Sequence, residues 1–111
     1  MWIFLNNAFF SIVRHGTKPG DLLVRARLEG DIERVFCVAG EHTPHADYAY
    51  RAVVSRDAVA EALSGEIREI NYSNFKNSVK EADRHGAYMD VWTVMRDLQE
   101  RRARSKRRQS R

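Results

Sequence analysis

Hydrophobic and polar residues alternate in four segments of the chain, and this alternation predicts β-strands. In residues 22–28 leucine, valine and alanine take every second position, and Arg25 and Arg27 lie between them. Because side chains on a strand point alternately to the two faces of a sheet, both arginines share one face. Short segments rich in Gly, Pro or Asn separate the first three strands, which favours an antiparallel meander. The predicted strands are 2–5, 8–15, 22–28 and 48–55.

Apolar residues recur every three or four positions in other segments, which predicts helices. Asp31 can cap the first helix and Gly40 can close it, and Ser55 can cap the second. The last helix has the most regular apolar stripe, which begins at Tyr88 and ends at Leu98. The predicted helices are 29–40, 56–70, 73–86 and 87–103, the third of them stopped near Gly86.

The order of these elements, β-β-β-α-β-α-α-α, indicates an α+β fold. We expect an antiparallel sheet of about four strands, with helices packed on one face and a long amphipathic helix at the C-terminus. A chain of 111 residues is long enough to bury a core without metal or disulfide staples. The expected organisation is one globular domain over residues 1–100 and a basic tail over residues 101–111. That tail either extends the last helix or is disordered.

The composition and the apolar segments indicate the cellular compartment in which we expect the protein to work. The single cysteine, Cys37, forms no internal disulfide framework and suits a reducing compartment. The apolar start lacks the basic segment of a signal peptide and is interrupted by Asn6 and Asn7. No segment approaches the roughly 20 apolar residues that span a bilayer. We therefore expect a cytoplasmic protein that does not interact with membranes.

Charge is distributed unevenly along the chain. The tail, RRARSKRRQSR, holds seven of the 19 Lys and Arg residues and none of the 15 Asp and Glu residues. Without those seven, residues 1–100 carry 12 basic and 15 acidic groups, a net charge of −3. The high pI is therefore a property of the tail, which can attract nucleic acid, whereas the body is mildly acidic.

Several short motifs occur together in a fixed order: MWIF and FFSIV, VRAR, DYAYRA, NYSNFK and VW. In this combination the chain resembles an uncharacterised family of small bacterial proteins of about this length. The resemblance covers residues 1–98 and implies no activity, cofactor or catalytic residue. The segment CVAGEHTPHA and the basic tail depart from the family's pattern, and both are places for a specialised property.

The first candidate site is a set of three arginines on two predicted strands. If strands 22–28 and 48–55 are neighbours, Arg25, Arg27 and Arg51 share the solvated face of the sheet. The planar guanidinium matches two oxygens of a phosphate or carboxylate at once, so such a face can bind anions. The alternative is that these arginines pair with acidic neighbours or lie in water. Tyr48 and Tyr50 are expected on the opposite face.

Three other groups of residues are weaker candidates for a functional site. The spacing of His42, His45 and Asp47 can place three metal ligands on one loop, although a polar loop explains it as well. Lys76 lies in the first turn of a predicted helix, where the helix dipole disfavours a cation. The thiol of Cys37 can pair with one of these histidines in an enzyme, but a buried cysteine acting as a small hydrophobe is the commoner case.

No catalytic motif, glycine-rich phosphate loop or zinc-binding motif is found in the sequence, so we expect no enzyme, metal or cofactor. The favoured function is a non-enzymatic interaction module that binds nucleic acid or another anionic partner. One alternative is a small protein-binding inhibitor or accessory factor of the kind found in phages and mobile elements. Another is a homodimer, if an apolar patch is exposed. The predicted binding residues are Arg25, Arg27, Arg51, Lys76, Arg101, Arg102, Arg104, Lys106, Arg107 and Arg108.

Overall fold

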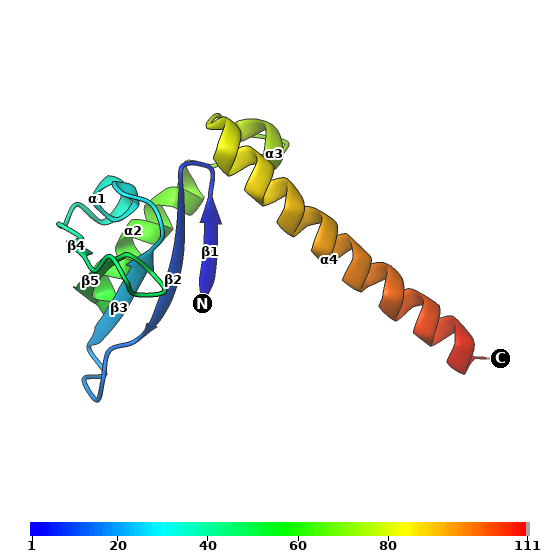
Figure 1. Ribbon diagram of the computed structural model, residues 1–111, viewed down its shortest axis with the longest axis horizontal. Coiled ribbons are helices and arrows are strands. Elements are labelled where there is room, and N and C mark those ends of the chain that lie inside the picture. Colours follow the sequence, from blue (N-terminus) through cyan, green and yellow to red (C-terminus); the bar gives the residue numbers. More distant parts are fainter. Residues whose placement is uncertain (111) are drawn as a thin grey trace. The chain divides into compact units, whose positions relative to one another are not determined.

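A computed structural model describes residues 1–110, and the chain divides into two compact units. Met1–Ser73 forms the first unit, and the second begins at Asn74. The first unit holds the β-sheet and two helices, and the second holds two further helices (Figure 1). The tail boundary expected at residue 100 lies within the last helix, so residues 101–109 continue that helix.

The sheet has five antiparallel strands in the spatial order β1-β2-β3-β5-β4, which confirms the α+β fold class. The prediction of about four strands missed β4, because two residues are too few to show an alternating pattern. The fourth predicted strand also begins two residues too early. The strands are β1 (Trp2–Leu5), β2 (Ala8–Arg14), β3 (Asp21–Ala26), β4 (Glu41–His42) and β5 (Tyr50–Ser55).

Two helices, α1 (Asp31–Phe36) and α2 (Arg56–Arg68), pack on one face of the sheet, as expected (Figure 1). Phe10 and Val24 on this face are completely buried. The rings of Phe10 and Phe36 pack edge-on, with their centres 5.0 Å apart. The apolar residues that alternate along the strands therefore form the core. Its buried members are Ala8, Phe10, Ile12, Val24, Ala26, Ile32, Val35, Phe36, Val54 and Val59.

Helix α1 is shorter than the pattern predicts, and its ends differ from the expected ones. Gly30, at φ 91°, holds the N-cap position, and the buried Asp31 accepts hydrogen bonds from the Phe9 N–H at 3.1 Å and from Arg34 at 2.6 Å instead of capping. The helix ends before Cys37, whose φ of 56° lies in the left-handed region. The predictions of a cap at Asp31 and a stop at Gly40 are therefore wrong, and Cys37 is exposed rather than buried.

The second unit contains the four-residue helix α3 (Phe75–Ser78) and the 28-residue helix α4 (Ala82–Gln109). The prediction that Gly86 stops a helix is wrong. The chain leaves the helical conformation at Val79, and α4 then runs through Gly86, because one glycine costs only about 1 kcal/mol in a helix interior. Among residues 1–110, no helix combines the length and the apolar character needed to cross a membrane.

The first testable prediction concerns the start of α2. The hydroxyl of Ser55 accepts a hydrogen bond from the Ala58 N–H at 3.1 Å, as the sequence predicted for a capping residue. Replacing Ser55 with Ala should lower the free energy of unfolding by about 1 kcal/mol, because this N–H loses its partner. Urea unfolding measures the change, and Ser55→Thr is the matched control, because it keeps a capping oxygen without adding a charge opposite Asp21. Equal losses in both variants would contradict the role of Ser55.

A second prediction concerns the turn that follows α1. The carboxylate of Glu33 accepts a hydrogen bond from the Gly40 N–H at 3.0 Å, and this bond lowers the pKa of Glu33. Because the folded pKa lies below the unfolded one, the stabilisation is present above the ordinary glutamate pKa and is lost as the pH falls through the lowered value. Glu33→Gln should therefore be less stable than the wild type at neutral pH and match it in acid. A difference that persists unchanged in acid would contradict this.

Candidate nucleic-acid interface

One row of side chains crosses the whole sheet on the face opposite to α1 and α2. In the strand register Ser11 lies between Trp2 and Arg25, and Arg25 lies opposite Arg51. Glu41 on β4 lies opposite Arg51. Directly paired residues on antiparallel strands point to the same face, so the row is continuous from β1 at one edge of the sheet to β4 at the other. We call this surface the arginine face and define it by Trp2, Phe9, Ser11, Arg25, Arg27, Glu41, Tyr48 and Arg51.

Tyr48 contacts all three arginines of this face. The guanidinium carbon of Arg27 lies 4.0 Å from the centre of the Tyr48 ring, and that of Arg25 lies 4.7 Å from it. Nε of Arg51 donates a hydrogen bond to the carbonyl oxygen of Tyr48 at 3.4 Å. Tyr48 is only 4% exposed. Arg25 and Arg27 are therefore held over one buried aromatic ring, and Arg51 is held by the backbone of the same residue.

The expectation that Tyr48 and Tyr50 point away from the arginines is wrong for Tyr48. β5 begins at Tyr50, so the alternation of the strand does not extend to Tyr48, which belongs to the preceding loop. Tyr50 packs against the core, as the alternation predicted. The loop thus brings an aromatic ring to the arginine face that the strand pattern alone assigns to the other side.

The three guanidinium groups differ in how far their charges are neutralised. Arg27 donates hydrogen bonds to the backbone carbonyl of Asp47 at 2.9 Å and to its carboxylate at 3.2 Å, and this ion pair is exposed to solvent. Arg25 donates to the hydroxyl of the buried Ser11 at 2.7 Å. Within residues 1–110, neither Arg25 nor Arg51 forms an ion pair. The three arginines face two carboxylates, those of Asp47 and Glu41, so the face keeps a net charge of +1.

The same face carries aromatic side chains at its β1 end. Trp2 is 69% exposed, and its ring packs edge-on against that of Phe9, with the two ring centres 6.3 Å apart. Phe9 in turn packs against Phe4, and the centres of these two rings lie 4.6 Å apart. The sequence identified Trp2 only as part of an apolar run. Its relation to Arg25 depends on the pairing of β1 with β2 and of β2 with β3, which a local pattern does not contain.

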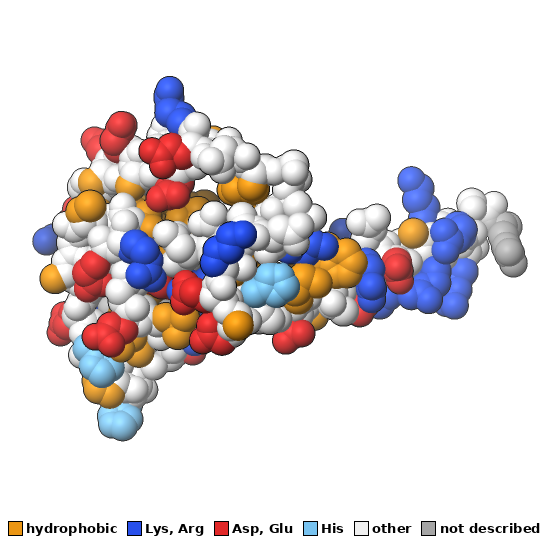
Figure 2. All heavy atoms as spheres, turned by 90° about the horizontal axis from the view of Figure 1, so that it is seen from above, with side chains coloured by type: hydrophobic (Ala, Val, Ile, Leu, Met, Phe, Trp, Pro, Cys, Tyr) orange, Lys and Arg blue, Asp and Glu red, His pale blue; other side chains and the backbone are white. Residues whose placement is uncertain are grey.

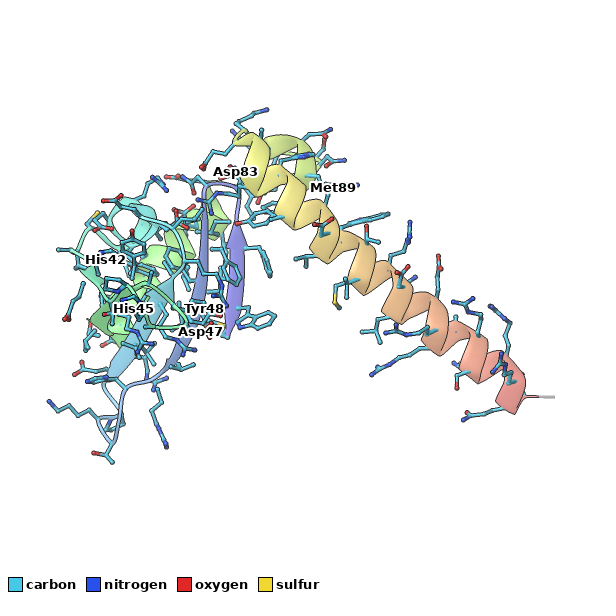
Figure 3. All side chains as sticks on the ribbon, viewed as in Figure 1. His42, His45, Asp47, Tyr48, Asp83 and Met89 are labelled. Carbon is cyan, nitrogen blue, oxygen red and sulfur yellow. The ribbon has the colours of Figure 1, made fainter. Side chains whose placement is uncertain are left out.

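The proposed metal-ligand loop is not assembled. His42 stacks on the ring of Tyr50 at 4.8 Å, whereas Asp47 is bonded to Arg27 (Figure 3). Across residues 1–110, no group of three or more His, Cys, Asp or Glu side chains is arranged to hold a metal ion. The thiol of Cys37 likewise forms no hydrogen bond with His42 or His45 in the described part of the chain.

The remaining predicted binding residues belong to the second unit. Lys76 is the second residue of α3, which has only about one turn, so its first turn, as the sequence predicted, is also its last. A helix this short has too few aligned peptide dipoles to disfavour a cation strongly. The ammonium group of Lys76 sits 4.6 Å from the centre of the Trp92 ring. Basic side chains cluster along the final turns of α4, where all of them are exposed (Figure 2). These are Arg101, Arg102, Arg104, Lys106, Arg107 and Arg108.

Comparison with known proteins adds no further constraint to this site. No protein family matches the chain, and neither a curated protein nor a solved structure shows significant similarity to it. The resemblance to a family of small bacterial proteins stays a prediction. Function has to be inferred from the charges and contacts of the described residues.

The contacts around Tyr48 lead to a third prediction. Tyr48→Leu keeps an apolar side chain but removes the ring on which Arg25 and Arg27 lie. It should lower the free energy of unfolding by about 1 kcal/mol or more, because both cation–π contacts are lost. Tyr48→Phe keeps the ring and should unfold at nearly the wild-type urea concentration. Equal destabilisation by the two substitutions would contradict a role for the ring.

Proposed function

We propose that this protein is a non-enzymatic module that binds nucleic acid through the arginine face. The observation that carries the proposal is the grouping of Arg25, Arg27 and Arg51 around Tyr48. Within residues 1–110, Asp47 is the one carboxylate that forms an ion pair with them, and Glu41 lies opposite Arg51. A guanidinium can donate two parallel hydrogen bonds to a phosphate. Three of them on a rigid sheet suit a ligand that carries several phosphates.

The fixed position of these side chains supports binding. A free arginine loses rotamer freedom when it binds, at about 0.5–1.5 kcal/mol for each side chain. Arg25 is already held by Ser11 and Tyr48, and Arg51 by the backbone of Tyr48. Much of this ordering is therefore complete before a ligand arrives, which leaves more of the phosphate interaction for affinity.

The basic end of α4 supplies a second, less specific attraction. Its six described cations have no acidic residue among them between positions 101 and 110. Such a segment attracts any polyanion and releases counterions when it binds, so its contribution falls steeply with added salt. In this proposal the tail concentrates nucleic acid near the protein, and the arginine face makes the defined contacts.

The fourth prediction separates the face from the tail. Arg51→Gln should weaken binding to a labelled single-stranded oligonucleotide of about 16 nucleotides, and should reduce the slope of log K against log salt by about 0.7. Arg68→Gln is the matched control, because it removes the same charge from α2, where Arg68 contacts Ser64. Fluorescence anisotropy across a salt series measures both quantities.

Two results would count against the proposal. If Arg51→Gln and Arg68→Gln weaken binding equally, the arginine face is not the site and attraction depends on overall charge. If the wild-type protein binds neither RNA nor DNA at low salt, nucleic-acid binding itself fails. Isolation of one stable protein partner would then favour the inhibitor or accessory-factor alternative.

A further inference from the structure

Trp2 is a large aromatic residue at the edge of the sheet, and its exposure is unusual for such a side chain. It remains 69% exposed, although aromatic side chains contribute most to stability when they are buried. It is not a loosely held side chain, because Phe9 contacts it edge-on and Phe4 packs against Phe9. An indole that is held in place yet left open has surface available for a flat ligand.

The position of Trp2 connects this surface to the arginine face. Trp2 pairs with Ser11, and Ser11 pairs with Arg25 and accepts its hydrogen bond. Trp2 and Arg25 are thus two strands apart in one row, a separation of roughly 10 Å at the usual strand spacing. A base stacked on Trp2 would place its neighbouring phosphates near the guanidinium groups.

We propose that Trp2 is a base-stacking residue and that the ligand of the arginine face is single-stranded nucleic acid. This inference rests on the proposed function and names its ligand class. Single strands are bound by surfaces that combine aromatic rings for bases with cations for phosphates. In a duplex the bases are already stacked on each other, so an aromatic ring on a flat sheet face gains nothing from them.

The sharpest test uses the fluorescence of Trp2. The chain has two tryptophans, so Trp92→Phe leaves Trp2 as the only one. This full-length variant is titrated at low salt with an oligothymidylate of about 16 nucleotides and with a duplex of equal length. Stacking should quench Trp2 fluorescence with the single strand and leave it nearly unchanged with the duplex. Quenching that is equal for both ligands would overturn the proposal.

The affinity of Trp2 variants provides the second measurement. In the full chain, Trp2→Ala should weaken single-strand binding by about 5- to 100-fold, the effect of losing one stacked base. Trp2→Phe should keep most of the affinity, because it retains an aromatic face. Duplex binding should be the same in the wild type and both variants. Anisotropy of a labelled oligonucleotide measures each value, and circular dichroism confirms that the variants are folded.

The outcomes distinguish this inference from the proposed function. If single strands bind the wild type and Trp2→Ala equally well, the stacking proposal is overturned but nucleic-acid binding stands. If no nucleic acid binds at low salt, the proposed function fails and the inference fails with it. Sedimentation of the free protein provides one more check. A wild-type dimer that Trp2→Ala dissociates would show that a second copy covers Trp2, and this too would overturn the proposal.

Discussion

The register between β2 and β3 determines which side chains meet on the outer face of the sheet. Phe10 and Ile12 on β2 and Val24 on β3 are buried beneath the helices, so the residues between them must point outward. A shift of one residue would turn Arg25 into the core, where an unpaired charge costs several kcal/mol. The hydrophobic core therefore fixes the arrangement of the arginine face, although none of its residues belongs to that face.

Tyr48 adds a constraint that the strands alone do not supply. Arginines on adjacent strands repel each other, and Arg25 lies directly opposite Arg51. The Tyr48 ring offers its electron-rich face to Arg25 and Arg27, and its carbonyl oxygen accepts from Arg51. One loop residue thus offsets part of the repulsion while leaving the net charge of the face unchanged.

The sequence predicts those parts of this site that depend on local alternation. Period-two spacing is sufficient to place Arg25 outward and Tyr50 inward, because it depends only on a residue's own strand. Arg27 lies just beyond the end of β3, and its place on the face comes from its contacts with Tyr48 and Asp47. The position of Trp2 beside Arg25 depends on two strand pairings, and that of Tyr48 depends on the path of a loop. The predicted cap of α2 at Ser55 is correct, but the helix ends predicted at Gly40 and near Gly86 are wrong for a related reason. Gly86 and Cys37 take conformations set by their surroundings rather than by their own preferences.

The helical state of the basic segment has a geometric consequence. An unstructured segment can gather its cations on one side of a ligand, whereas a helix spaces them at about 3.6 residues per turn. At that spacing the six cations between positions 101 and 108 point to all sides of the α4 axis. This end of the helix therefore has no preferred side for an approaching polyanion. In the proposed function this end would attract a strand from any direction without orienting it, so the orientation would be set by the arginine face.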